Sequence, residues 1–183
     1  MNNIARDKSI ALFAALLLAA SSGVQACIER APTAPAGAGP HDYSQAPSKS
    51  RLWRDGDEGE QLFVRARVLD TCSEPVAGAL VKLRHASHAG YFLTDRWRAD
   101  LKTDAGGAFS VLTVLPGYAG GLPRHMHFVI THPDHRQLVT RVYFKSDPAA
   151  HGDVNDLAIV LEEVRRDKAR GWVASLEFVM APE

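Results

Sequence analysis

The sequence predicts an all-β protein, an antiparallel β-sandwich preceded by a signal peptide and an extended N-terminal arm. Several short segments alternate apolar and polar residues, which is the period of a strand with one buried face. Turn residues separate these segments at nearly regular spacing, as in β-sandwiches. No stretch of ten or more residues has a convincing amphipathic helix pattern, which disfavours a fold with packed helices.

Residues 1–26 are typical of an export signal. A polar start with Arg6 and Lys8 is followed by the apolar run "IALFAALLLAA" and by small residues up to Ala26. This run is too short and too early for a membrane span, and no later run predicts a span in the mature chain. We therefore expect an exported protein, located in the periplasm or, if it is lipidated, attached to a membrane.

Cleavage after Ala26 would make Cys27 the first mature residue, and two outcomes are open for it. A lipid anchor at Cys27 would stand ahead of a polar linker, although Gln25 occupies a place where lipoprotein signals have a small or β-branched residue. Alternatively, Cys27 forms a disulfide with Cys72, because these are the only two cysteines and the exported compartment is oxidising.

Residues 27–60 are predicted to form an extended arm or linker, and residues 61–183 a single sandwich domain. The arm contains "APTAPAGAGP" and shows neither the helix nor the strand period. The first strand is "QLFVRARVLD" at 61–70, and after the turn "SEP" the second is "AGALVKLRHA" at 77–86. A loop with Gly90 then leads through "RWRADLKTD" to the turn "AGG".

The remaining strands are predicted from the same alternation and turn signals. They are "AFSVLTVL" at 108–115, "HMHFVITH" at 125–132, "LVTRVYF" at 138–144, "LAIVLEEV" at 157–164 and "WVASLEFVM" at 172–180. Alternate apolar residues would line the inner faces of the two sheets: Val64, Val68, Val81, Phe109, Val111, Phe128, Ile130, Val142, Phe144, Ile159, Leu161, Leu176 and Phe178.

The charges of the chain are balanced. Lys plus Arg and Asp plus Glu each total 21, so the formal net charge is zero. No basic face predicts nucleic-acid binding, and a small-molecule partner is favoured instead.

Two histidines, His125 and His127, flank Met126 at the start of the strand at 125–132. Side chains at i and i+2 of a strand point to the same face, so these two imidazoles can converge on one metal ion. The spacing predicts half of a metal site, whose other ligands come from elsewhere in the chain.

From about Gly59 to the C-terminus, the order and spacing of several segments resemble the intradiol ring-cleavage dioxygenases, especially their short exported members. The segments are "RVLDTCSEPVAGALVKLRHASHAGYF", "LKTDAGGAFSVLTVLPGYAGGLPRHMHF" and "TRVYFKSDP". They are similar to the family's Gly-x-Tyr, Thr-Asp-x-x-Gly, Thr-x-x-Pro-Gly and His-x-His stretches and to its Tyr-Phe…Asp-Pro strand. The resemblance implies a prealbumin-like β-sandwich.

The resemblance also implies a cofactor and a reaction. The family's cofactor is a non-haem ferric ion, Fe(III), bound by two histidines and two tyrosines, and a phenolate oxygen is a hard anionic donor that suits a hard cation. The expected substrates are O2 and a small catechol-type aromatic, which would be cleaved between its two hydroxyl-bearing carbons. We therefore expect an enzyme, an intradiol dioxygenase among the oxidoreductases.

By this resemblance, the metal ligands are His125, His127, Tyr118 and Tyr91. The histidines match without a gap, whereas each tyrosine stands one residue before the family position, which holds Ala119 or Phe92 here. A shift of one residue turns a side chain to the opposite face of a regular strand. Both tyrosines lie beside glycines, however, where a bulge or loop can re-aim a side chain.

Two arginines are candidate catalytic residues. Arg124 directly precedes His125, and Arg141 stands where the family has a glutamine. Either guanidinium could stabilise a catecholate or a developing negative charge in a buried site. The alternative is an arginine on a solvated strand face.

Two further functions are open. One is the same sandwich with a decayed site, retained as a binding module for carbohydrate, peptide or a partner protein. The other is a periplasmic copper or zinc protein that uses His125, His127 and a nearby histidine such as His85, because imidazole suits those ions. Both a monomer and a homo-oligomer fit the sequence.

Overall fold

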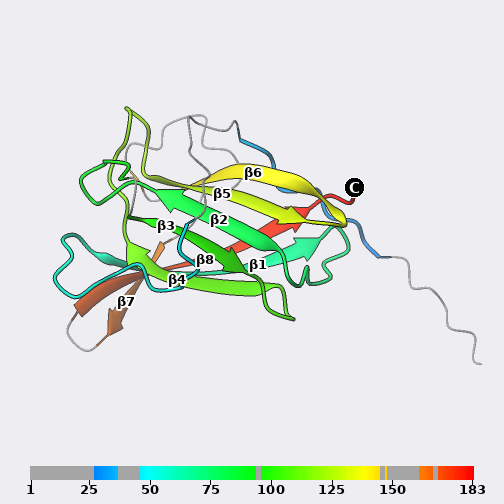
Figure 1. The fold of residues 1–183 in the computed structure, drawn as a ribbon, viewed down its shortest axis with the longest axis horizontal. Helices are drawn as coiled ribbons and strands as arrows, with labels where there is room; N and C mark the ends of the chain where they lie inside the picture. The colour runs from blue at the N-terminus through cyan, green and yellow to red at the C-terminus, as the bar shows by residue number, and fades with distance from the viewer. Residues whose placement is uncertain (1–26, 37–45, 94–95, 145–146, 148–160, 167–168) are drawn as a thin grey trace, which may run out of the picture.

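The computed structural model describes residues 27–36, 46–93, 96–144, 147, 161–166 and 169–183, which form two facing four-stranded sheets (Figure 1). The first sheet has the order β4-β1-β8-β7, with β1 at Gln61–Asp70, β4 at Ala108–Val114, β7 at Leu161–Arg166 and β8 at Ala169–Met180. The second has the order β3-β2-β5-β6, with β2 at Leu80–His85, β3 at Arg98–Lys102, β5 at His125–His132 and β6 at His135–Tyr143. Within these residues, no helix is long and apolar enough to cross a membrane.

The predicted all-β sandwich is confirmed, and β1 and β5 have the predicted bounds. All pairs but one are antiparallel among the strands that the structure describes. The exception is β1 with β8, which pair in parallel over ten residues from Gln61 opposite Gly171 to Asp70 opposite Met180. Parallel neighbours need a long connection, and here the connection runs through the other sheet. The predicted signal peptide at residues 1–26 lies outside the described residues.

One strand, β3 at Arg98–Lys102, lies in the segment that was predicted to be loop. Its sequence "RADLK" is short and holds Asp, Lys and Ala, which are uncommon in strands, so the signal was weak. The structure stabilises it through its pairing with β2, where Lys82 lies opposite Asp100 and their charged groups are 3.8 Å apart.

The core lies between the sheets and consists of the alternate apolar residues of both. Three phenylalanines meet at its centre: Phe109 and Phe178 from the first sheet and Phe128 from the second, with 4.9 Å between the ring centroids of Phe128 and Phe178. Leu176 is partly buried against this core. Ile159 and the side chain of Leu161 lie outside the described part of the chain. The other predicted inner residues are buried as expected: Val64, Val68, Val81, Phe109, Val111, Phe128, Ile130, Val142, Phe144 and Phe178.

The predicted arm packs against the sandwich where the structure describes it. Leu52 and Trp53 belong to the core cluster, and their backbone N–H groups both donate to the carbonyl of Leu112. Nearer the N-terminus, Cys27 and Cys72 form a disulfide with Cα atoms 5.3 Å apart. Of the two outcomes that the sequence leaves open for Cys27, the structure therefore contains the disulfide.

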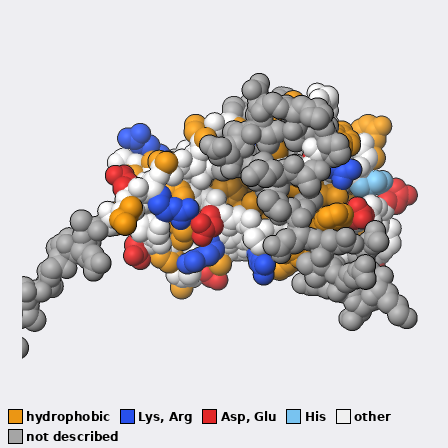
Figure 2. Space-filling model, turned by 180° about the vertical axis from the view of Figure 1, so that it is seen from behind, with side chains coloured by type: hydrophobic (Ala, Val, Ile, Leu, Met, Phe, Trp, Pro, Cys, Tyr) orange, Lys and Arg blue, Asp and Glu red, His pale blue; other side chains and the backbone are white. Residues whose placement is uncertain are grey.

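The described surface has no continuous region of one charge in the view of Figure 2, where Lys and Arg side chains are interspersed with Asp and Glu. This agrees with the zero net charge of the sequence.

Candidate metal centre

His125 and His127 lie at the start of β5, on the face of the second sheet that points away from the core. Met126 between them and Phe128 after them are fully buried in the core, so alternation along the strand places both imidazoles on the opposite face. The two ring centroids are 4.7 Å apart, and the residues are only 3% and 4% exposed. The structure therefore brings the two histidines together in a buried place.

The environment of His125 favours a neutral imidazole. Its Nδ1–H donates to the carbonyl of Pro123 at 2.7 Å, which leaves Nε2 as the nitrogen with the lone pair. Burial lowers the pKa of His125, the bond to Pro123 opposes this, and the positive charge of Arg141 lowers the pKa further. A neutral ring whose other nitrogen donates to a backbone carbonyl is the arrangement typical of metal-binding histidines.

Two glycine-containing loops lie against each other beside this pair. Gly90 has a φ of 86°, and a Cβ at this position would overlap the carbonyl oxygen of Tyr118. A Cβ at Gly117 would overlap the carbonyl oxygen of His88, and the N–H of Gly117 donates to Ser87 at 2.9 Å. Glycine is required at both positions because the two backbones touch.

These loops determine where the predicted tyrosine ligands lie. Tyr91 is 69% exposed, and Tyr118 is 46% exposed with its hydroxyl donating to Oδ1 of Asp147 at 2.8 Å. Phe92 instead lies beside the histidines, with its ring centroid 5.7 Å from that of His127 and 6.3 Å from that of His125. The side chain that the left-handed turn at Gly90 aims at the imidazoles therefore carries no oxygen.

A third tyrosine, Tyr143, lies at the histidine pair and was not predicted as a site residue. It is the register partner of His125 across β5 and β6, and the two ring centroids are 5.5 Å apart. The signal that could have found it is the hairpin: if the strands at 125–132 and 138–144 pair across the turn between them, Tyr143 falls opposite His125.

Arg141 is also at the site, since it is the register partner of His127. On the other side of β5, Arg84 of β2 is also a register partner of His127. The guanidinium carbon of Arg84 lies 5.5 Å from the ring centroid of Phe92. The Nε–H of Arg141 is buried and donates to no acceptor among the described residues. This donor points to a ligand with an oxygen acceptor.

Arg124, the other predicted catalytic residue, belongs to a cluster around Asp147. Its backbone N–H donates to Oδ2 of Asp147 at 2.9 Å, and its guanidinium carbon lies 5.1 Å from the ring centroid of Tyr118. Asp147 is the acidic residue of the "SDP" segment and is only 7% exposed. It ties the loop before β5 to the segment that follows β6.

The other histidines that the structure describes do not extend the pair into a metal cluster. His85 is fully buried, its Nδ1–H donates to the carbonyl of Ala86, and its Nε2 accepts from the hydroxyl of Thr113, so both nitrogens are in use. Within the part of the chain that the structure describes, no group of three His, Cys, Asp or Glu side chains could hold a metal ion. The copper or zinc hypothesis with His85 as third ligand therefore gains no support.

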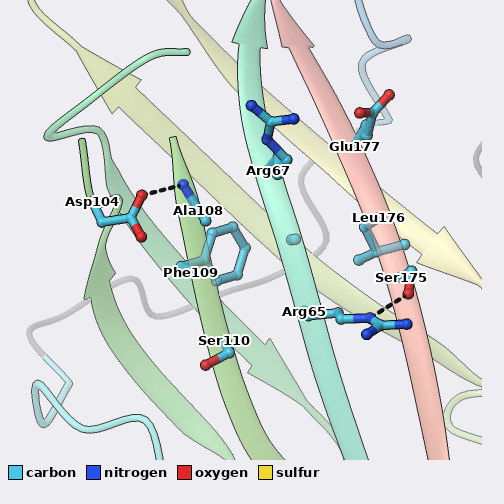
Figure 3. Close-up of a pocket in the computed structure, with 10 residues that line it drawn as sticks. Arg65, Arg67, Asp104, Ala108, Phe109, Ser110, Ser175, Leu176 and Glu177 are labelled. Carbon is cyan, nitrogen blue, oxygen red and sulfur yellow. Dashed lines mark hydrogen bonds between the residues drawn. The ribbon is translucent and has the colours of Figure 1, made fainter. Parts of the chain in front are cut away.

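A separate open pocket of about 620 Å³ lies on the other sheet (Figure 3). Arg65 and Arg67 of β1 line it together with Ser175 and Glu177 of β8, and Arg65 donates to Ser175 at 2.8 Å. These four residues are exposed to solvent, and no histidine lines the pocket.

Comparison with known proteins gives one consistent result, although no family model matches the chain. The chain is 30% identical to catechol 1,2-dioxygenase 2 of Acinetobacter lwoffii, over 69% of this chain and 58% of that protein. It is 28% identical to chlorocatechol 1,2-dioxygenase of Pseudomonas putida, over 82% of this chain and 69% of that protein. The chain thus spans somewhat more than half the length of these curated relatives.

Solved structures agree with these relatives. The fold is similar to that of 3-chlorocatechol 1,2-dioxygenase from Rhodococcus opacus 1CP, with a TM-score of 0.75 and 22% identity, covering 83% of this chain and 74% of that one. The dioxygenase domain of a dioxygenase carbohydrate-binding fusion protein from Streptomyces sp. SirexAA-E has a TM-score of 0.74 and 25% identity, covering 81% of this chain and 97% of that domain. The resemblance found in the sequence is confirmed.

Proposed function

We propose that this chain, a relative of the intradiol catechol dioxygenases, is an exported non-haem iron enzyme that opens a catechol-like ring between its two hydroxyl-bearing carbons. The observation that carries the proposal is the buried pair of His125 and His127, 4.7 Å apart between ring centroids, in a chain whose relatives are named for this reaction. O2 and a small catechol-type aromatic would be the substrates.

The side chains around the pair fit a ferric ion. The Nδ1–H of His125 donates to the carbonyl of Pro123, which leaves Nε2 for an ion, and His127 lies on the same face two residues later. The phenol of Tyr143, whose ring centroid is 5.5 Å from that of His125, is a hard oxygen donor beside the pair. A bound ferric ion would bind both oxygens of a catechol and make the ring reactive toward O2.

The chain's own residues would bind the substrate and shield it. Arg141, the register partner of His127, has a buried Nε and would stabilise the negative charge of a catecholate. Arg124 would add positive charge from the neighbouring loop. The ring of Phe92 lies beside both imidazoles and would keep water from them.

Export is part of the proposal and is supported by two features. Residues 1–26 have the composition of a signal peptide. The only two cysteines of the chain, Cys27 and Cys72, are joined in a disulfide, which persists in oxidising compartments. With its Sγ in this bond, Cys27 would anchor no lipid, so the periplasm is the proposed location.

The test is metal analysis and visible absorption of the protein purified without an affinity tag. We expect bound iron, a visible band and O2-dependent consumption of catechol, and we expect His125→Ala and His127→Ala to abolish iron binding. The matched control is His132→Ala, at the far end of the same strand, which should keep the iron. An iron-free, colourless protein that resists reconstitution with iron would overturn the proposal.

The same experiment addresses the alternative of a decayed binding module. The observation that favours this alternative is Phe92, which places an oxygen-free ring where the family resemblance implies a tyrosine. Such a module would bind catechol or glycan equally well with and without iron, as calorimetry would reveal.

A further inference from the structure

We infer that Tyr143, a residue of β6, supplies the phenolate oxygen of the metal centre, in the role for which the sequence suggested Tyr91 and Tyr118. The inference rests on the proposed function, because it needs an ion at His125 and His127. It goes beyond that function by naming a different oxygen donor on a different element.

The first argument is the position of Tyr143 on the sheet. His125 and Tyr143 are directly opposed across β5 and β6, so their side chains leave the same face of the sheet. His127 is two residues further along β5 and shares that face. The three rings therefore form one cluster on two hydrogen-bonded strands, with centroid separations of 4.7 Å and 5.5 Å around His125.

The second argument is reach. A ring nitrogen that binds an ion holds it about 3 Å from the imidazole centroid, and a phenolate holds it about 4.5 Å from its ring centroid, for bonds of ordinary length. The observed 5.5 Å between the His125 and Tyr143 centroids lies well within the sum of these two lengths. The separation of the two rings therefore allows both side chains to bind one ion without a change of strand register.

The third argument is the position of the other phenols. Of the four tyrosines in the sequence, Tyr43 lies outside the described residues. Tyr91 is 69% exposed on its loop, and the hydroxyl of Tyr118 is donated to the carboxylate of Asp147. Among the described tyrosines, Tyr143 is the one with a ring contact to His125.

The fourth argument is charge. Arg141 lies on the same strand two residues before Tyr143 and therefore on the same face of the sheet. The guanidinium of Arg141 and a trivalent ion would both place positive charge on this face of the sheet. A phenolate ligand carries a negative charge that offsets part of this positive charge, whereas an imidazole ligand carries none.

The experiment uses the full-length exported protein, reconstituted with iron in air, and follows iron content and tyrosinate-to-iron absorption. Tyr143→Phe should lose the visible band and the resonance Raman modes of an iron-bound tyrosinate. The double variant Tyr91→Phe with Tyr118→Phe should keep both signals. If Tyr143→Phe fails to fold, the double variant still tests whether the visible band needs Tyr91 or Tyr118.

The outcomes separate the inference from the proposed function. A band that survives in Tyr143→Phe, or that vanishes in the double variant while iron stays bound, overturns the role of Tyr143 and leaves the iron enzyme intact. A wild-type protein that takes up no iron overturns both. Loss of the band in Tyr143→Phe together with its retention in the double variant supports the inference.

Discussion

Acidification should destabilise this protein through one buried residue, His85. It is fully buried, and burial lowers its pKa from 6.5 to about 4, opposed by the bond to Ala86 and reinforced by the nearby His125. The unfolded chain takes up a proton near pH 6.5 while the folded protein does not until about pH 4, so stability is complete above the unfolded pKa and declines below it. A shift of this size corresponds to about 3 kcal/mol of unfolding free energy, lost as the pH falls through this window.

The assay is urea unfolding of the metal-free protein at several pH values between about 7.5 and 4. The matched variant is His85→Gln, which keeps polar atoms beside Thr113 but does not titrate. We expect the wild type to lose about 3 kcal/mol more than the variant over this range, whatever their difference at neutral pH. Parallel pH profiles for the two proteins would refute the reasoning, since they would mean that His85 is protonated equally in both states.

Three further changes have defined outcomes. Phe92→Tyr adds a phenol beside His127 and should intensify the visible band of the iron-loaded protein; an unchanged spectrum would mean that position 92 does not reach the ion. Replacing Cys27 and Cys72 together by serine should lower the unfolding free energy by roughly 2 to 4 kcal/mol, because the bond closes a loop with a sequence separation of 45, and equal midpoints in urea would contradict this. Arg141→Gln should reduce catechol turnover by about 10²-fold or more with iron content retained, and Arg141→Lys should recover part of it; wild-type turnover in Arg141→Gln would remove this residue from catalysis.

Most of the fold could be predicted because the sandwich obeys simple periodicity. In β1 and β5, every second residue is apolar, and turn residues bound both segments, so their ends were predicted without error. The strand β3 was missed because its stabilisation comes from pairing with β2, which a single segment does not reveal. The parallel pairing of β1 with β8 was missed for the same reason, since it depends on the order of strands in the sheet.

The site was predictable only in part. The i, i+2 spacing of His125 and His127 is a local property of one strand, and the structure brings the pair together as expected. The tyrosines belong to irregular loops, where one glycine at positive φ decides which neighbour faces inward, and position 92 faces the histidines instead of position 91. The position of Tyr143 beside His125 depends on the register between β5 and β6, which cannot be predicted from either segment alone.

The placement of these aromatic side chains suggests how the site would work as a unit. A donor set of His125, His127 and Tyr143 comes from two neighbouring strands whose relative position is fixed by backbone hydrogen bonds, so its geometry is preorganised before any ion binds. With Tyr143 as the oxygen donor, the loop that contains Gly90 need not supply a ligand. It would instead supply the apolar ring of Phe92 beside the histidines. Covering the imidazoles lowers the local polarity, which strengthens the attraction of a guanidinium such as that of Arg141 for a substrate oxygen. The sheet would therefore supply the rigid ligands, and the loop would supply a separate apolar side chain beside them. The spectrum of Tyr143→Phe tests the ligand on the sheet, and the spectrum of Phe92→Tyr tests the side chain on the loop.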